Sequence, residues 1–475
     1  MAEINQDLFF STIPELHAHL MDKSLSAADL ARAFAGRLQQ LGPRYNALAL
    51  PLTQQAVRKA EHVDKDLKRG RTRGPLQGIP YGAKDLISFA GQPTTWGAPP
   101  LASQVFDYDA TVITRLSGVG AVLAGKLSTV QLAGGGGYRF ASASLQGPGK
   151  NPWDTARWSG GSSSGPAAAV AAGLVPFAIG SETSGSIVTP ASYCGVTALR
   201  PTYGLVSRHG AMALSWTLDK LGPFARSAED CGLILQVIAG KDGQDPGSAG
   251  QSFYYTPQYA RPVKEMRAGF APVDVAEWAD PETRPAFQAA FAALREAGMA
   301  FQETKLPDFP YGSVINAVIG AEEASIFEPM ITSGQVNQLA DAAQIAGLKA
   351  NLDIPATAYL KAMRIRRQIQ DAFQELFGSV DVLVAPGRFS VATPIDQPLD
   401  RDRPGTPPQD RGMTPLIQAA NLAGLPALVL PCGFAGNLPV ALQIVGPPFS
   451  ENVLLAIGRE FQARTDWHKR RPPVA

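Results

Sequence analysis

A glycine- and serine-rich stretch near the middle of the chain constrains its fold more than any other feature. Residues 159–165 read Ser-Gly-Gly-Ser-Ser-Ser-Gly and run into Pro166 and a row of small residues that ends at Gly173. Proline at the start of a helix and glycine just past its end are the usual asymmetry, so residues 167–172 predict a short, small-faced buried helix. Residues 175–179 are apolar and predict a strand. Gly/Ser tracts are usually flexible linkers, but a tract between buried elements must satisfy its N–H groups within the fold.

The remainder of the chain alternates helical patterns with short apolar runs. Ser26 is a suitable N-cap for the first expected helix, and the helices cover residues 27–41, 54–68, 281–297, 356–377 and 452–464. Buried strands are expected over residues 380–385, 427–431 and 440–445. Strands that alternate with helices favour a layered α/β architecture.

We expect a single domain over residues 1–475. It divides into a helical segment (1–70), a core that carries the chemical motifs (71–240), a variable and partly helical region near the pocket (240–350) and a C-terminal part that completes the sheet (350–475). Residues 400–411 are rich in proline and charge and predict a loop. The loop that covers the pocket is expected within residues 240–260 or 308–350.

Charge and cysteine content exclude several functions. The 42 Lys+Arg and 41 Asp+Glu give a net charge of +1, which supplies no field for nucleic acid or an anionic membrane. Cys194, Cys231 and Cys432 lie far apart and support neither a disulfide framework nor a zinc site, so no metal is expected. No secretory signal and no apolar stretch of about 18 residues is visible, so a cytoplasmic protein without membrane contact is expected.

Two motif matches lose their usual function when their context is considered. Residues 120–126 have the glycine and lysine spacing of a phosphate-binding loop, but Leu127 stands where a Ser or Thr must bind magnesium. Residues 161–165 fit GxSxG, but the apolar strand that leads into a nucleophile elbow is missing before them. Neither nucleotide binding nor the α/β-hydrolase arrangement is therefore expected.

Histidine is too scarce to support a Ser-His-Asp arrangement. The chain contains only His17, His19, His62, His209 and His468, and no motif surrounds them. A nucleophilic serine would need another base. Lys84 follows a short apolar run within Gly-Ile-Pro-Tyr-Gly-Ala-Lys-Asp-Leu (78–86). Such a lysine is most often ion-paired or at the surface, but one buried against apolar walls can lose its charge and act as a base.

A second small-residue loop, Glu-Thr-Ser-Gly-Ser-Ile over residues 182–187, follows the predicted strand. A turn through residues 183–186 can direct successive backbone amides at one point, as an oxyanion hole requires. Gly185 permits the backbone angles of such a turn.

At this density of motifs the chain resembles the amidase signature family. The resemblance rests on residues 78–86, 151–154, 159–165, 184–187, 190–191, 194–195, 199–204, 218–226, 421–426 and 431–433, and it extends over roughly residues 10–465. It implies an α/β/α fold, a central mixed β-sheet covered by helices on both faces. It also implies a cofactor-free serine hydrolase of small-molecule amides, with homodimer formation as an option.

The resemblance further implies a Ser-cisSer-Lys triad. Lys84 corresponds to the base, Ser162 to a relay serine after a cis peptide bond, and Ser186 to the nucleophile. The backbone amides of Thr183, Ser184, Gly185 and Ser186 correspond to the oxyanion hole. Gly135, Gly136, Gly137 and Ser163 are expected to bind substrate, because the glycines of residues 134–137 replace bulkier residues of relatives and suggest an open, mostly apolar wall on the acyl side.

The positions at which the chain departs from the family pattern determine which substrate we expect. Around the nucleophile, Ser184 replaces a glycine and Val188 an arginine. The glutaminase subunit of tRNA amidotransferases carries an acidic residue where Thr414 stands. Arg366 resembles an arginine of that subunit. It also lies on the charged face of an expected helix, however, and an arginine on such a face needs no further function.

The leading hypothesis is therefore a stand-alone amidase that acts on neutral, fairly hydrophobic amides, with aryl amides, esters and carbamates (urethanes) as further substrates. The alternative is the glutaminase subunit of a tRNA-dependent amidotransferase, which requires partner chains. A scaffold that retains the fold without the chemistry is a third interpretation.

Overall fold

One large mixed sheet takes strands from almost the whole chain. The computed structural model describes residues 5–399 and 408–473, so most of the loop predicted over 400–411 lies outside the described residues. The sheet has 11 strands in the order β1-β3-β2-β6-β8-β7-β12-β13-β11-β9-β10. In chain order these are β1 (Leu48–Pro51), β2 (Pro80–Lys84), β3 (Val122–Leu127), β6 (Phe177–Glu182), β7 (Thr197–Arg200), β8 (Lys220–Ala225), β9 (Arg267–Phe270), β10 (Ala300–Glu303), β11 (Val382–Pro386), β12 (Ala427–Ala435) and β13 (Leu438–Val445). A separate hairpin pairs β4 (Lys150–Asn151) with β5 (Asp154–Trp158).

The sheet contains two groups of parallel strands that are separated by a run of antiparallel pairs. Strand β2 runs parallel to both β3 and β6, and β9 runs parallel to both β10 and β11. The strands between these two groups pair antiparallel. The predicted α/β/α architecture with a mixed central sheet is confirmed.

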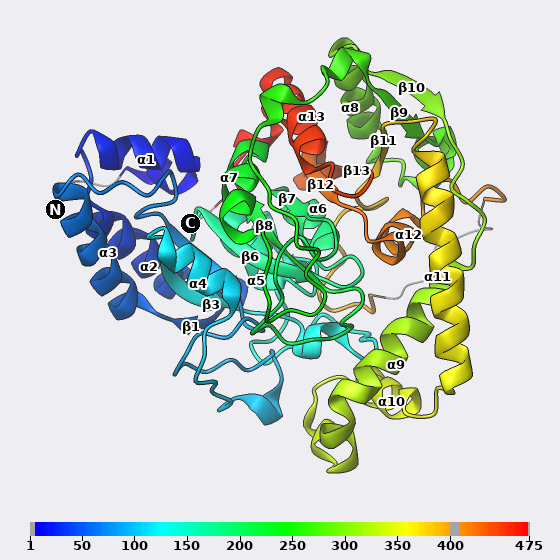
Figure 1. The fold of residues 1–475 in the computed structure, drawn as a ribbon, viewed down its shortest axis with the longest axis horizontal. Coiled ribbons are helices and arrows are strands. Elements are labelled where there is room, and N and C mark those ends of the chain that lie inside the picture. Colours follow the sequence, from blue (N-terminus) through cyan, green and yellow to red (C-terminus); the bar gives the residue numbers. More distant parts are fainter. Residues whose placement is uncertain (1–4, 400–407, 474–475) are drawn as a thin grey trace.

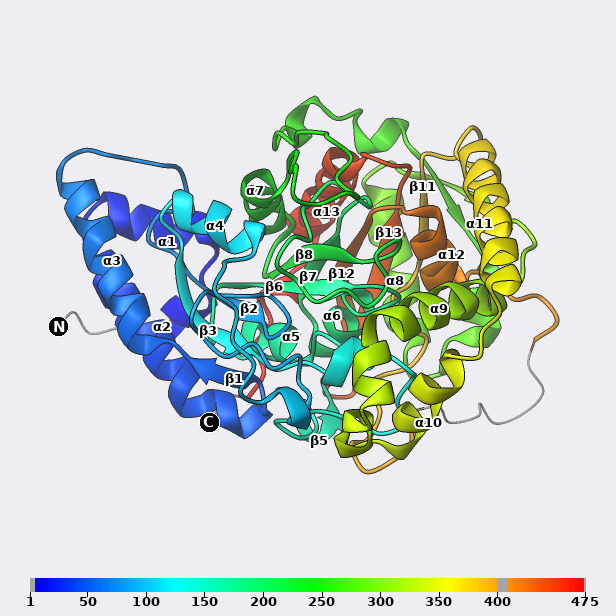
Figure 2. The same ribbon diagram turned by 60° about the horizontal axis from the view of Figure 1, so that its bottom comes forward.

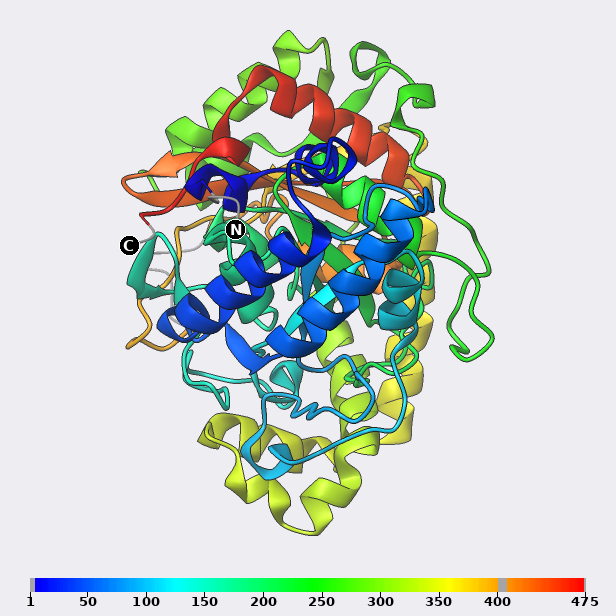
Figure 3. The ribbon, with the colours of Figure 1, turned by 90° about the vertical axis from the view of Figure 1, so that its left-hand side faces the viewer.

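Helices cover both faces of this sheet (Figure 1). They are α1 (Ile13–Met21), α2 (Ala27–Leu41), α3 (Thr53–Lys68), α4 (Thr111–Gly118), α5 (Ser164–Ala171), α6 (Val188–Cys194), α7 (Ala228–Ile238), α8 (Arg284–Glu296), α9 (Tyr311–Thr332), α10 (Ala342–Asn351), α11 (Ala356–Leu376), α12 (Leu416–Ala423) and α13 (Glu451–Arg464). The blue helices α2 and α3 lie side by side at the β1 end (Figure 3). Helices α9, α10 and α11 lie on the far side of the molecule from α2 and α3, where α9 packs against both α10 and α11 (Figure 2).

Helix α2 illustrates how local sequence sets these elements. The Ser26 hydroxyl accepts the N–H of Asp29, and the Asp29 carboxylate accepts the N–H of Ser26, which forms a capping box. The side chains of Leu30, Phe34 and Leu38 recur at helical spacing and are fully buried. The N-terminal segment is not entirely helical as predicted, because β1 pairs with β3 and places residues 48–51 in the sheet.

Small residues allow α5 to lie close against the sheet. All eight of its residues, Ser164–Ala171, are buried, and a Cβ on Gly165 would collide with backbone atoms of Ser128 and Ala47. The strand predicted over 175–179 lies instead at Phe177–Glu182, so β6 extends to the start of the second loop. Much of the region 308–350, one of two expected positions for a pocket loop, forms helices α9 and α10.

Candidate active site

Lys84 ends strand β2 and is completely buried. Its Nζ lies 2.8 Å from Ser162 Oγ, 3.1 Å from Ser163 Oγ and 2.9 Å from Ser181 Oγ, within hydrogen-bonding distance of each. Burial lowers the pKa of Lys84 to about 7, against the opposing charges of Asp219 and Glu182. A lysine with this pKa exchanges its proton near neutral pH.

The Gly/Ser tract that contains Ser162 is fixed in place by its surroundings. The peptide bond between Gly161 and Ser162 is cis, and the carbonyl of Ser162 accepts hydrogen bonds from Val130 N and Thr129 Oγ1 at 3.1 and 3.0 Å. Gly160 has φ of 85°, and a Cβ there would lie 2.5 Å from Pro190 Cα. The tract is therefore a packed part of the core and not a flexible linker.

Ser186 lies in the turn between β6 and α6. Of the predicted triad it is the most exposed, at 9%, whereas Lys84 and Ser162 are at 0% and 1%. Gly185 has φ of 89°, the left-handed conformation that the turn requires. Neither the Ser186 hydroxyl nor the N–H groups of residues 183–186 donate a hydrogen bond to a described residue. Buried N–H groups are almost always paired, so this turn presents donors that a ligand oxygen can satisfy.

A buried ion pair that the sequence analysis did not predict stabilises the turn at residues 183–186. Glu182 Oε1 accepts hydrogen bonds from Arg200 Nη1 at 2.6 Å and Asn421 Nδ2 at 2.7 Å. Its Oε2 accepts the N–H groups of Ile187 and Val188, which begin α6. Burial alone would raise the pKa of Glu182, but Arg200 lowers it to about 2. Arg200 lies in one of the family motifs, as a charged residue within an apolar stretch. That contrast was the sequence feature from which a buried ion pair could have been predicted.

A second buried carboxylate connects the turn to its neighbours. Asp219 Oδ1 accepts the hydroxyl of Thr183 at 2.6 Å, and Oδ2 accepts the N–H groups of Leu214 and Ser215. Ser215 in turn donates to Glu322 on α9 at 2.5 Å. Asp219 therefore links the turn at residues 183–186 to α9, and no pattern in the sequence indicated this connection.

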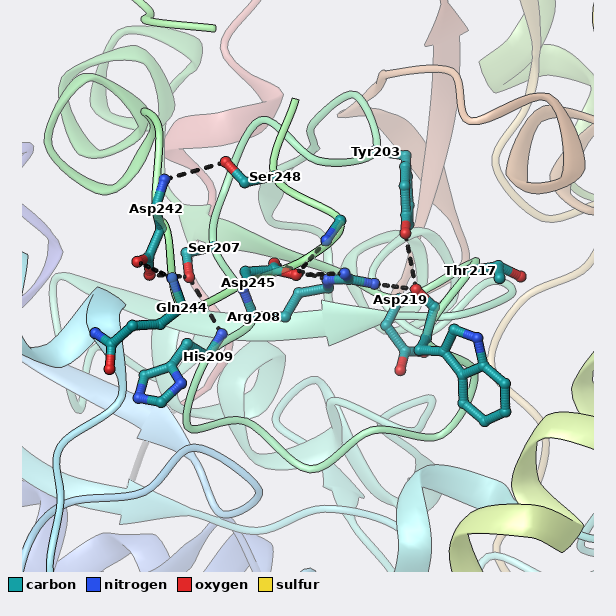
Figure 4. A network of polar contacts seen from close by, with 12 residues as sticks. Tyr203, Ser207, Arg208, His209, Thr217, Asp219, Asp242, Gln244, Asp245 and Ser248 are labelled. Atoms are coloured by element: carbon teal, nitrogen blue, oxygen red, sulfur yellow. Dashed lines mark hydrogen bonds and ion pairs between the residues drawn. The ribbon is translucent and has the colours of Figure 1, made fainter. Parts of the chain in front are cut away.

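A cavity of about 250 Å³ lies beside these residues and is lined by Leu86, Ala133, Ser181, Thr183, Met212, Leu214, Trp216 and Leu221 among others. Figure 4 shows the polar network around Arg208 and Asp245, which also line the cavity: Arg208 Nε donates to Asp245 at 3.0 Å, and Tyr203 donates to the carbonyl of Trp216 at 2.8 Å. Ser181 and Thr183 belong to both the cavity and the site, so the cavity reaches the surroundings of Lys84.

The predicted glycine wall is closed on one side. Gly136 has φ of 78°, and a Cβ there would lie 2.5 Å from the carbonyl oxygen of Gln344 on α10. Gly137 has φ of 75° but no atom within 4 Å of the corresponding position. The glycine at 136 thus permits the close approach of α10, while residue 137 faces open space.

This contrast predicts that Gly136→Ala destabilises the protein more than Gly137→Ala. Both changes place alanine at a positive φ, which costs about 1 kcal/mol, but only Gly136→Ala adds an overlap with α10. We expect Gly136→Ala to lower the free energy of unfolding by about 2 kcal/mol more, the typical cost of overpacking. Urea denaturation of the two variants measures the difference, and equal midpoints would contradict the proposed packing.

Arg366 and Thr414 were the residues on which the expected substrate depended. Arg366 does not lie on an exposed charged face, because it is buried and donates to the carbonyls of Leu422 at 2.8 Å and Thr217 at 2.7 Å. Its guanidinium therefore joins α11 to two other segments. Thr414 donates to the carbonyl of Arg411 in the turn before α12.

Within residues 5–399 and 408–473, no group of three or more His, Cys, Asp or Glu side chains could hold a metal ion. In the same residues, no helix is long and apolar enough to cross a membrane.

A lysine, a serine after a cis peptide bond and a turn with unpaired N–H groups, set at one edge of a mixed sheet, match the features of the amidase signature. The family model described as Amidase matches residues 29–455. The chain belongs to this family, and it is an amidase-type hydrolase of C–N bonds.

Relatives span nearly the whole chain. It is similar to a glutamyl-tRNA(Gln) amidotransferase subunit from Chloroflexus aggregans, with 36% identity over 99% of each chain. It is similar in structure to the peptide amidase of Stenotrophomonas maltophilia, with a TM-score of 0.83, 30% identity and 98% coverage of each chain. The corresponding glutamyl-tRNA(Gln) amidotransferase subunit from Thermotoga maritima has a TM-score of 0.74 and 27% identity, over 96% of this chain and 95% of that one.

Proposed function

We propose that the chain hydrolyses amide-type carbonyl bonds through an acyl-enzyme at Ser186, with Ser162 and Lys84 as the proton relay. The observation that carries this proposal is the buried Lys84 Nζ, which lies 2.8 Å from Ser162 Oγ and has a pKa lowered to about 7. The neutral amine accepts a proton, which a charged lysine cannot do.

In the proposed mechanism Ser186 Oγ attacks the carbonyl carbon while its proton passes through Ser162 to Lys84. The N–H groups of residues 183–186 stabilise the negative oxygen of the tetrahedral intermediate. Collapse breaks the C–N bond, and the relay returns the proton to the leaving nitrogen. Water then attacks the acyl-enzyme in the same way and releases the acid.

The proposed substrates are small amides and aryl amides, with esters and carbamates as further candidates, because acyl-enzyme chemistry accepts any carbonyl with an adequate leaving group. The apolar side chains of Leu86, Met212 and Leu221 in the cavity support neutral substrates. The test is the hydrolysis of p-nitroacetanilide, a simple ester and a small aryl carbamate by wild type and by Ser186→Ala. Equal rates in the two proteins would refute the assignment of Ser186.

A second candidate is the glutaminase subunit of a tRNA-dependent amidotransferase, with protein partners. The similarity to one chain of such an enzyme, at 36% identity over 99% of each sequence, supports it. Two observations favour the first candidate: Thr414 lacks a carboxylate, and Arg366 is occupied by the carbonyls of Leu422 and Thr217. Glutamine-dependent ammonia release and co-purification with partner chains would favour the second.

Size-exclusion chromatography of the purified chain tests the proposed homodimer.

The pKa of Lys84 predicts the pH dependence of the reaction. Because the base is the neutral amine, kcat/KM should fall about tenfold for each pH unit below about 7 and level off above it. The negative charge of Asp219 favours the protonated lysine, so Asp219→Asn should move the inflection to lower pH. A pH profile of p-nitroacetanilide hydrolysis measures both, and an inflection that stays in place in Asp219→Asn would contradict this account.

A further inference from the structure

Trp216 lines the cavity beside the proposed catalytic centre and differs from every other tryptophan of the chain. Of the six, it is the only exposed one, at 42%. Four of the others pack against aromatic rings, and Trp278 donates its indole N–H to a carbonyl. Within residues 5–399 and 408–473, no ring packs against Trp216 and no group accepts its indole N–H. A single exposed apolar side chain is ordinary, so the surroundings of Trp216 decide whether this one has a function.

Two side chains fix the carbonyl of Trp216. Tyr203 Oη donates to it at 2.8 Å, and Arg208 Nη1 also donates to it (Figure 4). Arg208 is itself held by Asp245, whose carboxylate accepts its Nε at 3.0 Å and its backbone N–H at 2.8 Å. Because the carbonyl is already occupied, the part of Trp216 that remains for a ligand is its indole side chain.

The peptide groups on either side of Trp216 are fixed to buried carboxylates. The N–H of Ser215 donates to Asp219 at 3.0 Å, and the N–H of Thr217 donates to Glu322 at 3.1 Å. Asp219 also accepts a hydroxyl of the proposed oxyanion turn. The backbone that carries the indole is therefore tied to the catalytic centre. A ligand that packs against this indole has little main chain to order, which lowers the cost of binding.

The cavity extends from the oxyanion turn to Trp216. Ser181 and Thr183 line it where it is buried, whereas Trp216 lines it where the side chain reaches solvent. The apolar side chains of Leu86 and Leu221 also contribute to its walls. Its volume is about 250 Å³. An apolar cavity of about 150 Å³ already binds benzene, so this cavity has room for one six-membered ring in addition to the reacting group.

We propose that Trp216 determines specificity by stacking against an aromatic ring of the substrate. This inference rests on the proposed amide hydrolysis and narrows its substrates to neutral amides that carry one aromatic ring, on the acyl part or on the leaving amine. The substrate needs no charge, because Arg208 and Asp245 beside the indole already pair with each other. An aromatic pair is favoured beyond the effect of its buried area, so the indole discriminates an aromatic ring from a saturated ring of the same size.

The test compares amides with a phenyl ring and amides with a cyclohexyl ring, each separated from the amide by methylene groups. In the acyl series, phenylacetamide and 3-phenylpropionamide are paired with cyclohexylacetamide and 3-cyclohexylpropionamide. In the amine series, N-benzylacetamide is paired with N-(cyclohexylmethyl)acetamide. Ammonia or amine release gives the ratio of kcat/KM values for each pair. In at least one series, Trp216→Leu should lower the phenyl-to-cyclohexyl ratio about 3- to 10-fold relative to wild type, the range of an aromatic pair.

Two variants separate recognition from a general effect on the fold. Trp216→Phe keeps an aromatic ring, so the ratio should stay within about twofold of wild type. Tyr259→Leu removes an aromatic side chain that is 83% exposed and lies outside the cavity, and the ratio should not change. The same ratio in wild type and Trp216→Leu for every pair, or an equal fall in Tyr259→Leu, would overturn the proposal.

Fluorescence separates this inference from the proposed reaction. A nitro-substituted ring quenches an indole that it contacts, so 4-nitrophenylacetamide or N-(4-nitrobenzyl)acetamide should quench part of the tryptophan emission of Ser186→Ala, which binds without turnover. Ser186→Ala combined with Trp216→Phe should lose most of this quenching. Equal quenching of the two proteins by both compounds would overturn the role of Trp216. Quenching that depends on Trp216, without hydrolysis of any of the amides by wild type, would support Trp216 and refute the proposed reaction.

Discussion

Ser186→Ala is expected to lower kcat/KM for p-nitroacetanilide by about 10⁴-fold or more. Removal of a nucleophilic serine abolishes the acyl-enzyme and leaves only binding and oxyanion stabilisation, as mutants of other serine hydrolases show. Ser186 makes no hydrogen bond to a described residue, so its hydroxyl supports no other part of the fold. The melting temperature should therefore stay within about 2 °C of wild type. Steady-state kinetics and thermal denaturation of the same preparations measure the two quantities.

Ser184→Ala is the matched control in the same turn. It also lacks a hydrogen bond from its hydroxyl to a described residue, and its proposed contribution is a backbone N–H that alanine retains. We expect kcat/KM to fall by less than about tenfold, since loss of a real oxyanion donor costs about 10²–10³-fold. A loss as large as that of Ser186→Ala would show that the side chain of Ser184 takes part in the reaction.

Arg200→Met is expected to produce the largest loss of stability. The Arg200–Glu182 pair is 2.6 Å long with both side chains at 0% exposure, and removal of Arg200 leaves the buried carboxylate without its ion-pair partner. Such changes cost about 3–5 kcal/mol of unfolding free energy. Urea denaturation measures the loss, and Arg200→Met with Glu182→Gln should recover part of it, because the double variant buries no unpaired charge.

Arg367→Met is the control for this measurement. Arg367 pairs with Asp371 at 2.9 Å, but the two side chains are 73% and 49% exposed. Solvent screening makes such pairs worth about 0–1 kcal/mol, so little change is expected. A loss in Arg200→Met no larger than in Arg367→Met would refute the importance of the buried pair.

Local patterns predicted those elements whose stabilising contacts lie close together in sequence. The capping box of Ser26 and the spacing of Leu30, Phe34 and Leu38 define α2 within a few turns, and the helix has the predicted bounds, Ala27–Leu41. The glycine and proline that flank the alanine-rich segment likewise indicated α5. Prediction was wrong where distant contacts decide the structure: β6 extends to Glu182 because it pairs with β8, and Arg366 is buried because α12 covers it.

The glycines at residues 134–137 show the same difference between what local sequence predicts and what distant contacts decide. The sequence indicated that residues 134–137 require space, but it could not show what occupies that space. Helix α10, more than two hundred residues away, approaches Gly136, and Glu323 on α9 faces Gly135. Gly136 therefore leaves room for α10, and Gly135 leaves room for the carboxyl of Glu323 and the side chain of Leu214.

The sequence by itself determined the family, the layered α/β fold and the identity of the candidate residues, because motifs and periodicity are local properties. Only the tertiary structure decided their chemistry. Lys84 meets Ser162 and Ser181 across 78 and 97 residues, and its pKa is lowered by the burial that this assembly creates. The pairing of Glu182 with Arg200 and the fixed position of Trp216 depend equally on strands and helices that meet only in the folded protein. Desolvation is a property of the whole fold, and no short sequence pattern encodes it.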